Sequence, residues 1–434
     1  MKHMEAKFSF YKAGQGSFYG GRIWQHENNK VFTVVYDCGT SSFIAGNSQS
    51  LNSEINHFKH LQNYFAHNNE IELLFISHLD YDHVSGLKRL LTEFNVKNVI
   101  LPYIEKEHRK FFFVSVSDNI DPQNDLSVED YILFIESPIT FIGEYSKETK
   151  IYFVKPNEKL EIEYEGYDAE NQSENIYSRG NLIQIEELEN APNVFVYDNN
   201  LQFFIQQKWE FTTYVKSVNE LAISNLHNCL KKKLKKKSTE SLTLDDLKEI
   251  ATSRRKEAHT CYTNHIGEIN SHGLVLLHGP INYMHLEGGI YSDCELHHFY
   301  NDRHRRYYHY DRPSRNNNSI MSGTLLFGDT SINPVNNPID FPPAFKNKLV
   351  NVHIVQVPHH GSSKNWDFEK FKELNIGDSI NRWHNRVLSV CNFGYGNTYG
   401  HPSHQMLNDL RTTIFLNTQF SRLNIEYDVI HRTS

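Results

Sequence analysis

The sequence is organised around one short turn that holds four potential metal ligands: His78, Asp80, Asp82 and His83. Residues 71–76, just before the turn, are almost all apolar, which is typical of a buried strand. In residues 87–94, just after it, large apolar side chains recur at helical spacing. Asp82 or Ser85 could cap that helix, but two carboxylates and two imidazoles crowded into one turn are costly unless a cation compensates them. The pattern therefore favours a metal site on a strand-to-helix turn.

The length and composition fit a globular protein with a large core. The 434 residues are enough for one large domain with insertions or for two domains, and 39% of them are hydrophobic. No stretch approaches the roughly 18 consecutive apolar residues that a membrane-spanning helix needs, and residues 1–14 lack the apolar core of a secretory signal. The cysteines are odd in number, widely spaced and without a CxxC motif: Cys38, Cys229, Cys261, Cys294 and Cys391. This spacing argues against a disulfide framework, so we expect a soluble, cytoplasmic protein.

Two basic segments stand out in a chain whose net charge is −8. The first is a lysine run at the end of a predicted helix: Lys231, Lys232, Lys233, Lys235, Lys236 and Lys237. The second interleaves arginines with aromatic residues: Arg303, Arg305 and Arg306. Either segment could contact nucleic acid, through phosphates or through base stacking. The alternatives are a solvated helix face for the lysines and a surface hairpin or subunit contact for the arginines, and the overall negative charge does not decide between them.

Strands alternate with helices in residues 1–103 and again in the last third of the chain, which indicates an α/β layered architecture. Between these parts we predict two insertions: residues 104–260, with mixed strands and helices, and residues 280–320, a loop rich in Arg, Tyr and His. Polar residues fall just beyond the ends of several apolar strands: Asp37, residues 78–83, Asp329, His359, His360 and His401. Loops after such strands gather at one edge of a sheet, so these residues are predicted to form one site.

The order of these motifs resembles the metallo-β-lactamase fold superfamily. The turn at residues 78–83 is similar to its HxHxDH signature, with Asp80 in place of the second histidine. The resemblance is closer to the hydrolase domain of ComEC-type competence proteins and their free-standing relatives, whose motifs match in order at Asp37-Cys38-Gly39, residues 78–83, Asn270, Gly328-Asp329, His359-His360-Gly361-Ser362 and Tyr399-Gly400-His401-Pro402. It covers residues 1–103 and 265–430, which are predicted to form the hydrolase domain. It implies an αββα sandwich, two mixed sheets flanked by helices, with the two insertions added.

The resemblance also implies two divalent metal ions, either Zn²⁺ or Mn²⁺, with Mg²⁺ as a further alternative. The expected ligands are His78 and Asp80 for the first ion, Asp82, His83 and one of His359 and His360 for the second, and Asp329 as a bridge. Because Asp80 replaces a histidine, Mn²⁺ and Mg²⁺ should compete better with Zn²⁺ here than at a histidine-rich site. Asp82 could also orient the attacking water.

Further residues are expected beside the metal ligands. His401 could bind the scissile phosphate or protonate the leaving group, or it could only stabilise its own turn by a hydrogen bond. Asp37 is expected to orient a ligand without binding metal. Asn270 occupies the place of a further histidine of the superfamily, and His265 and His272 lie nearby in the sequence as substitutes.

These features predict a metal-dependent phosphodiesterase, a nuclease that uses a metal-bridging hydroxide on DNA or RNA. Fold alone does not decide a substrate, so two alternatives stay open. One is a metallo-hydrolase of a small ester, lactone or cyclic nucleotide. The other is a hydrolase-fold subunit of a multi-protein bacterial system, such as one for phage defence, with protein partners docked on the insertions. The two basic segments favour the nucleic-acid substrate.

Overall fold

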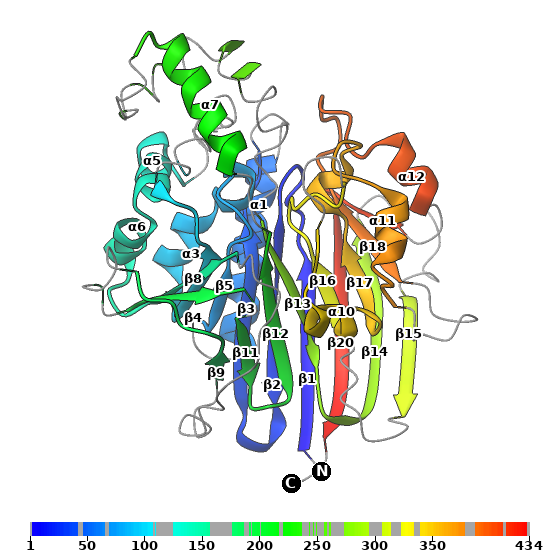
Figure 1. The fold of residues 1–434 in the computed structure, drawn as a ribbon. Helices are drawn as coiled ribbons and strands as arrows, with labels where there is room; N and C mark the ends of the chain where they lie inside the picture. Colours follow the sequence, from blue (N-terminus) through cyan, green and yellow to red (C-terminus); the bar gives the residue numbers. More distant parts are fainter. Residues whose placement is uncertain are drawn as a thin grey trace.

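The computed structural model shows two large β-sheets packed face to face, with helices on their outer faces (Figure 1). It describes residues 2–41, 47–65, 69–106, 109, 125–156, 176–185, 191, 193–199, 201–216, 220–236, 243, 246, 249, 256–257, 260–261, 273–294, 306–313, 323–333, 339–377, 387–410 and 414–431. The two sheets flanked by helices agree with the layered α/β architecture predicted from the sequence.

Ten strands form the first sheet. In spatial order they are β10 (Val194–Asp198), β8 (Lys150–Lys155), β7 (Asn98–Pro102), β5 (Leu73–Phe75), β3 (Lys30–Cys38), β2 (Phe18–Gln25), β1 (Lys2–Phe10), β20 (Ser421–His431), β14 (Tyr283–Cys294) and β15 (Arg306–Pro313). In this spatial order, neighbouring strands from β10 to β3 are parallel, and neighbouring strands from β3 to β15 are antiparallel. Along β20, buried residues alternate with more exposed ones, which is the pattern of a strand with one face on the core.

Eight strands form the second sheet. In spatial order they are β19 (Ile414–Asn417), β18 (Leu388–Asn392), β17 (Val352–Gln356), β16 (Gly323–Leu326), β13 (Leu274–Pro280), β12 (Trp209–Val215), β11 (Gln202–Ile205) and β9 (Ile176–Arg179). β4 (Glu70–Ile71) and β6 (Asn95–Val96) form a separate short pair. Every residue of β12 and β13 is buried. Both faces of these central strands are therefore covered.

The helices lie on the two outer sides of the sandwich. They are η1 (His26–Asn28), α1 (Asn47–Phe65), α2 (Tyr81–Val84), α3 (Leu87–Glu93), α5 (Val128–Glu136), α6 (Pro138–Tyr145), α7 (Glu220–Lys233), α10 (Pro343–Leu349), η7 (Pro358–Gly361), α11 (Phe368–Glu373) and α12 (His404–Leu410). Residues of α1, α3, α5, α6 and α7 share one hydrophobic cluster with the outer face of the first sheet. Residues of α10 and α12 share another with the outer face of the second sheet. None of the described helices is long and apolar enough to cross a membrane.

A third hydrophobic cluster fills the space between the two sheets. Phe8 of the first sheet lies 5.7 Å from Trp209 of the second, measured between ring centroids, and Phe75 lies 5.8 Å from Phe211 in the same way. All four rings are at most 1% exposed. Aromatic burial of this extent is a major contribution to the stability of a fold.

The predicted insertions supply strands to both sheets. From residues 104–260, β8 and β10 extend the first sheet, while β9, β11 and β12 complete the second. From residues 280–320, β14 pairs with β20 along the first sheet. These strands were not expected to be central, because their sequences are short and separated by polar segments. The domain boundaries themselves stay a prediction.

The cysteine spacing argued against a disulfide framework, but two of the cysteines pair with each other. Cys229 of α7 and Cys261 form a disulfide, although 32 residues separate them in the sequence. Their Cα atoms lie 5.7 Å apart, because residues near both ends of this segment pack on the same hydrophobic cluster. The spacing carries no motif that would reveal this pairing. Cys38 and Cys391 are buried free thiols.

Candidate metal centre

The ends of parallel strands bring the predicted site residues together at one edge of the sandwich. β3 and β5 are parallel neighbours in the first sheet, and β16 and β17 are parallel neighbours in the second. Their following loops place seven side chains in one group, the His/Asp cluster: His78, Asp80, Asp82, His83, Asp329, His359 and His360. All seven are the ligands predicted from the sequence, and their role in binding metal stays a prediction.

Asp37, at the end of β3, fixes the turn that carries the two histidines of the first sheet. Its Oδ1 accepts a hydrogen bond from the backbone N–H of Ser77 (2.7 Å), and its Oδ2 accepts one from the Ser77 hydroxyl (2.7 Å). The same Oδ2 lies 2.8 Å from Nδ1 of His83, so Nε2 of His83 faces the cluster. Asp37 thus lies where the sequence analysis expected it, beside a ligand.

Ser77 is a functional residue that the sequence analysis missed. Besides binding Asp37, its hydroxyl lies 2.8 Å from Nδ1 of His78. It therefore connects the carboxylate of Asp37 to the imidazole of His78, and both histidines present Nε2 inward. Its position directly before His78, at the end of an apolar strand, was a signal that could have revealed it.

Asp329 lies at the centre of the His/Asp cluster. Its Oδ1 is 3.2 Å from Nε2 of His83 and 3.7 Å from Nε2 of His360. Its Oδ2 is 3.6 Å from Nε2 of His78 and 3.8 Å from Nε2 of His359. Each oxygen of this one carboxylate therefore faces two imidazoles, and the cluster has two sides.

Asp80 and Asp82 each face a different imidazole of the cluster. The Oδ2 of Asp80 is 3.7 Å from Nε2 of His78, and the Oδ2 of Asp82 is 3.2 Å from Nε2 of His360. His360 donates its Nδ1–H to the backbone carbonyl of Asn392 (2.9 Å), which leaves the lone pair of Nε2 toward the cluster. Asn392 was not singled out from the sequence, because its contribution is a backbone carbonyl.

The backbone of the cluster is held in unusual conformations. His359 and His360 have φ angles of 43° and 52°, which non-glycine residues rarely adopt. Asp37 has a φ of 56°. Gly328 has a φ of 54°, and a Cβ there would lie 2.7 Å from the Cβ of Ser77. For the non-glycine residues among them, this conformation costs roughly 1–3 kcal/mol each, and such residues concentrate at functional sites.

Burial and mutual attraction shift the charges of the cluster. Burial raises the pKa of Asp80 to about 7, although His78 opposes the shift. Burial also opposes the ionisation of Asp329, but the surrounding imidazoles, His359 and His83 foremost, hold its pKa well below the usual range. For His83, burial alone would lower the pKa, but Asp329 and Asp37 raise it well above the usual value. The protein thus holds the Asp329 carboxylate ionised among imidazoles, beside the Asp80 carboxyl, which burial drives toward its neutral form.

The donor atoms of the cluster fit a divalent metal ion. The Nε2 atoms of His78 and His83 are buried and have no hydrogen-bond partner among the described residues. Three groups of three residues each offer ligand atoms that lie within 4.8 Å of one another: His78, His83 and Asp329; Asp82, His83 and His360; and His78, Asp80 and Asp82. Buried imidazoles without partners and several buried carboxylates are stable together when a cation binds both.

Metal affinity should fall as the pH is lowered. Because the pKa of Asp80 is raised to about 7, its carboxyl is protonated below that value and must lose a proton before it binds a cation. We expect the Kd for Mn²⁺ to rise at least about tenfold per pH unit below pH 7, because Asp80 releases one proton and His83, whose pKa is raised, must also lose its proton before it binds. Calorimetric titration at about pH 6 and about pH 8 measures this change. The same affinity at both pH values would contradict it.

His401 lies beside the cluster, with its ring centroid 5.5 Å from that of His359 and 6.2 Å from that of His360. Burial, with His360 and His359, lowers its pKa to about 3, so the imidazole is neutral at neutral pH. A neutral imidazole can accept or donate one hydrogen bond but is a poor proton donor. Of its three predicted roles, this favours binding of the phosphate over protonation of the leaving group. Its backbone N–H and carbonyl also bind Asn397, which stabilises the turn.

Several predicted residues lie outside the cluster or outside the described chain. Asn270, Lys237, Arg303 and Arg305 are not among the described residues, nor are the substitutes His265 and His272. Arg306 begins β15, of which the structure describes the backbone. Lys231, Lys232 and Lys233 lie in the last turn of α7. Lys235 follows that helix, and Lys236 forms an ion pair with Asp246.

Residues 29–170 match the model of the metallo-beta-lactamase superfamily. No curated protein matches the sequence. The chain is similar to the metallo-beta-lactamase fold protein YhfI from Bacillus subtilis, with 6% identity over 96% of this chain and 99% of that chain and a TM-score of 0.33. It is also similar to a long form RNase Z from yeast, with 7% identity over 89% of this chain and 36% of that chain and a TM-score of 0.30. Identities and TM-scores this low say nothing about a shared substrate.

The matched segment begins at β3 and includes Asp37 and the turn at residues 78–83. The two packed sheets with helices on both sides, and a site at the ends of their strands, have the architecture expected for this superfamily. The closer resemblance to ComEC-type proteins stays a prediction. Residues 29–170 therefore carry a metallo-β-lactamase superfamily domain, and the chain has the metallo-β-lactamase fold.

Proposed function

We propose that this protein is a metal-dependent phosphodiesterase that cleaves nucleic acid. The observation that carries the proposal is the position of Asp329, whose two carboxylate oxygens each face two imidazoles. One carboxylate with ligands on both sides suits a bridge between two divalent ions. Most proteins of the superfamily are metal-dependent hydrolases, and the ComEC-like order of motifs supports nucleic acid as the substrate.

The two sides of Asp329 suggest which residues hold each ion. His78, Asp80 and His359 are assigned with Oδ2, and His83, Asp82 and His360 with Oδ1. This division refines the expectation from sequence, which left His359 and His360 as alternatives for one ion. Bound ions would supply a hydroxide at neutral pH and stabilise negative charge on the phosphate. Asp82 is partly exposed and is suited to orient the attacking water.

The rim of the site offers aromatic side chains for the bases of a substrate. Tyr395 and Tyr399, on the loop that carries His401, are 67% and 45% exposed. The rings of Tyr399 and His401 are stacked, with centroids 5.8 Å apart. Large exposed aromatic residues beside a candidate phosphate-binding histidine suit the stacking of nucleotide bases.

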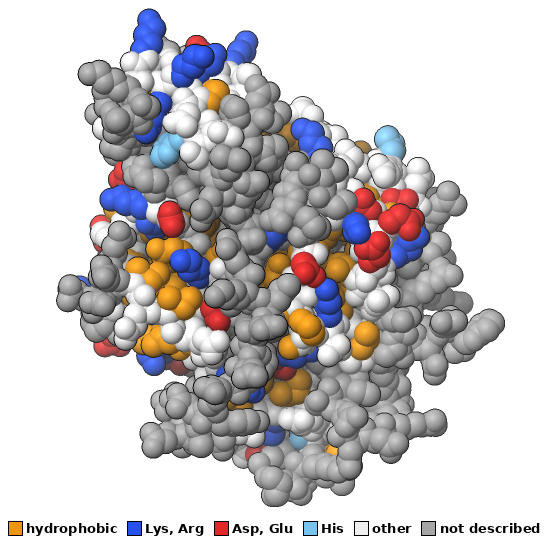
Figure 2. All heavy atoms as spheres, viewed as in Figure 1, with side chains coloured by type: hydrophobic (Ala, Val, Ile, Leu, Met, Phe, Trp, Pro, Cys, Tyr) orange, Lys and Arg blue, Asp and Glu red, His pale blue; other side chains and the backbone are white. Residues whose placement is uncertain are grey.

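Basic side chains also gather at this end of the molecule. Figure 1 shows α7 at the end of the sheets where the catalytic loops lie, and Figure 2 shows Lys and Arg side chains concentrated over it. Lys232 and Lys233 are exposed. A basic surface of this kind attracts the phosphate backbone of a long substrate.

The proposed activity is tested by incubating Mn²⁺-loaded protein with single- and double-stranded DNA and RNA. We expect Mn²⁺-dependent cleavage, lost in the Asp82→Ala, His83→Ala variant and kept in Asp340→Asn, an exposed carboxylate that pairs with Lys346 at the surface. Hydrolysis of a small ester or lactone without cleavage of any nucleic acid would contradict the proposal that nucleic acid is the substrate. Tightly bound metal without any hydrolysis would overturn the enzymatic function.

Replacing both rim tyrosines should separate nucleic acid from small substrates. Each stacked base contributes about 1–3 kcal/mol, so Tyr395→Ala, Tyr399→Ala should lower kcat/KM for an oligonucleotide about tenfold or more. Hydrolysis of bis(p-nitrophenyl) phosphate, which has no base, should change little. Tyr64→Ala is the matched control, since Tyr64 is 69% exposed on α1. Equal losses for both substrates would contradict a role in base stacking.

Charge reversal on α7 should weaken nucleic-acid binding and its salt dependence. In Lys231→Glu, Lys232→Glu, Lys233→Glu, each lost phosphate contact should reduce the slope of log K against log salt by about 0.9 for duplex DNA. Reversal of Lys370 and Lys372 on α11 is the control, because both pair with glutamates on that helix. An unchanged slope in the α7 variant would exclude the helix from the binding surface.

A further inference from the structure

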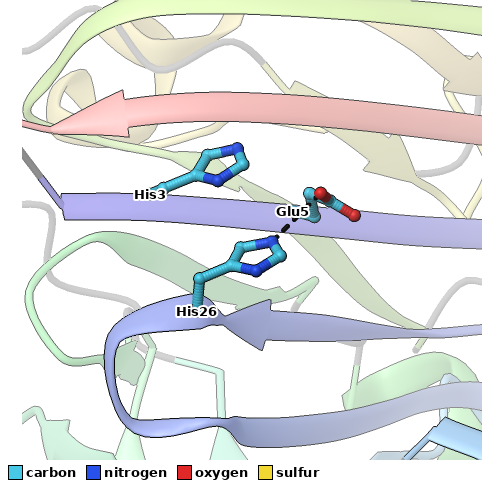
Figure 3. A group of neighbouring side chains, drawn as sticks. All are labelled: His3, Glu5 and His26. Carbon is cyan, nitrogen blue, oxygen red and sulfur yellow. Dashed lines mark ion pairs between the residues drawn. The ribbon is translucent and has the colours of Figure 1, made fainter.

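We propose that His3, Glu5 and His26 form a second binding site, for a single divalent transition-metal ion such as Zn²⁺, distinct from the His/Asp cluster. Figure 3 shows the two imidazole rings side by side, with the Glu5 carboxylate at their edge. One potential ligand atom from each of the three residues lies within 4.8 Å of the others. Two imidazoles and a carboxylate are a ligand set that Zn²⁺, Co²⁺ and Ni²⁺ prefer.

This site lies at the opposite end of the first sheet from the His/Asp cluster. β1 and β3 both run antiparallel to β2, so they point in the same direction. The ends of β1 and β3, at Phe10 and Cys38, lie at the edge of the sheet that carries the His/Asp cluster, and the beginnings of both strands lie at the other edge. The seven residue-to-residue steps from His3 to Phe10 span about 23 Å of strand. The two sites therefore share no ligand.

The register of the strands explains why the three side chains meet. Met4 of β1 pairs with Gln25 of the antiparallel β2, so the next residues, His3 and His26, lie beside each other. Glu5 is two residues from His3 and therefore lies on the same face of β1. Met4 is fully buried between the sheets, which turns His3 and Glu5 to the outer face.

The contact between His26 and Glu5 resembles two ligands around a cation more than a hydrogen bond. Nε2 of His26 lies 3.0 Å from Oε1 of Glu5. Nevertheless this nitrogen is buried and makes no hydrogen bond among the described residues. Two ligand atoms that each lie about 2.0–2.2 Å from one metal ion are about as far apart as these two atoms are, and they do not point at each other.

Neighbouring groups hold both imidazoles in place. The ring of His26 stacks with those of His3 and Trp24, each with centroids 4.4 Å away. Nε2 of His3 lies 2.5 Å from Oδ1 of Asp428 on β20. With Nε2–H donated to this carboxylate, Nδ1 of His3 keeps the lone pair that binds a metal. The backbone N–H of His3 also donates to Glu27 (2.6 Å).

A bound ion would connect the first strand to the turn after β2. β1 lies between β2 and β20 in the middle of the first sheet. The ion would stabilise this end of the sheet without taking part in hydrolysis. The alternative is two separate histidine–carboxylate ion pairs, of the kind that His285 and Glu287 form on β14 (2.8 Å).

The test is the zinc content of four proteins after saturation with Zn²⁺ and removal of the excess: the unmodified chain, His3→Ala/His26→Ala, Glu5→Gln and His285→Ala. We expect one equivalent less in the two variants of the proposed site and no loss in His285→Ala. The increase in Tm on addition of Zn²⁺ should be smaller in the same two variants, while hydrolysis by all four proteins should be equal. Glu5→Gln, which keeps the size of the side chain, decides the outcome if the double variant does not fold.

Equal zinc contents in all four proteins would overturn the second site, as would the same loss in His285→Ala. The comparison is made between proteins with identical residues in the His/Asp cluster. Its outcome therefore does not depend on whether the proposed phosphodiesterase activity is correct.

Discussion

Replacement of Asp329 by asparagine is expected to lower kcat/KM for phosphodiester cleavage on the order of 10³-fold or more, as removal of a principal electrostatic group at an active site does. The substitution keeps the shape of the side chain but removes the charge that faces four imidazoles. Both proposed ions would lose their shared anionic ligand. Metal content should fall in parallel, which mass spectrometry of the purified protein measures.

The matched control for this substitution is Asp340→Asn. Asp340 is exposed and pairs with Lys346 at the surface, so its loss should leave both activity and metal content unchanged. An Asp329→Asn protein that keeps full activity and the same metal content would show that Asp329 is not a ligand. The proposed division of the cluster into two sides would then be wrong.

The replacement Trp209→Ala is expected to lower the free energy of unfolding by about 3–5 kcal/mol, the usual cost of removing a large aromatic side chain from a core. Trp209 is fully buried and packs between the sheets against Phe8 and Tyr427, with centroids 5.7 and 5.3 Å away. Its indole N–H also donates to Nδ1 of His278 (3.3 Å), and that nitrogen would lose its partner. Denaturation with urea measures the loss.

Trp24→Ala is the control, because Trp24 lies on the outer face of β2 and is only partly buried. We expect it to cost about 1 kcal/mol, in the usual range of single substitutions. Similar losses in the two variants would contradict the packing of β12 in the centre of the sandwich.

The turn at residues 78–83 and the order of the motifs were predictable because they depend on local patterns. An apolar strand before the turn and a helix after it place the ligands without knowledge of the rest of the chain. The loops after parallel strands meet at one edge by the geometry of the sheet. That rule was sufficient to predict that Asp329 and the two histidines of η7 lie beside the turn, although about 250 residues of sequence separate them. The prediction required no knowledge of side-chain positions.

The division of ligands around Asp329 was not predictable from the sequence. It depends on His359 and His360 both having positive φ angles, which point the adjacent imidazoles to different oxygens of one carboxylate. Propensity disfavours this conformation for histidine, and only the surrounding structure enforces it. The position of Ser77 before His78 was visible in the sequence, but its contacts with both Asp37 and His78 depend on how the turn folds.

The central position of β12 and the Cys229–Cys261 disulfide were missed for a different reason. Both depend on contacts between distant segments. Trp209 becomes a core residue because β12 pairs with β13, more than 60 residues later in the sequence. Hydrophobic periodicity within β12 gave no sign of its partner, because a short strand that is buried on both faces does not alternate.

The most direct test of the proposed metal centre is a crystal of the Mn²⁺-loaded protein, with anomalous diffraction recorded at the manganese edge. We predict two anomalous peaks, one on each side of the Asp329 carboxylate. The first should contact His78, Asp80 and His359, and the second should contact Asp82, His83 and His360. A fully loaded crystal with no peak at the His/Asp cluster, or with a peak that does not contact Asp329, would contradict the account.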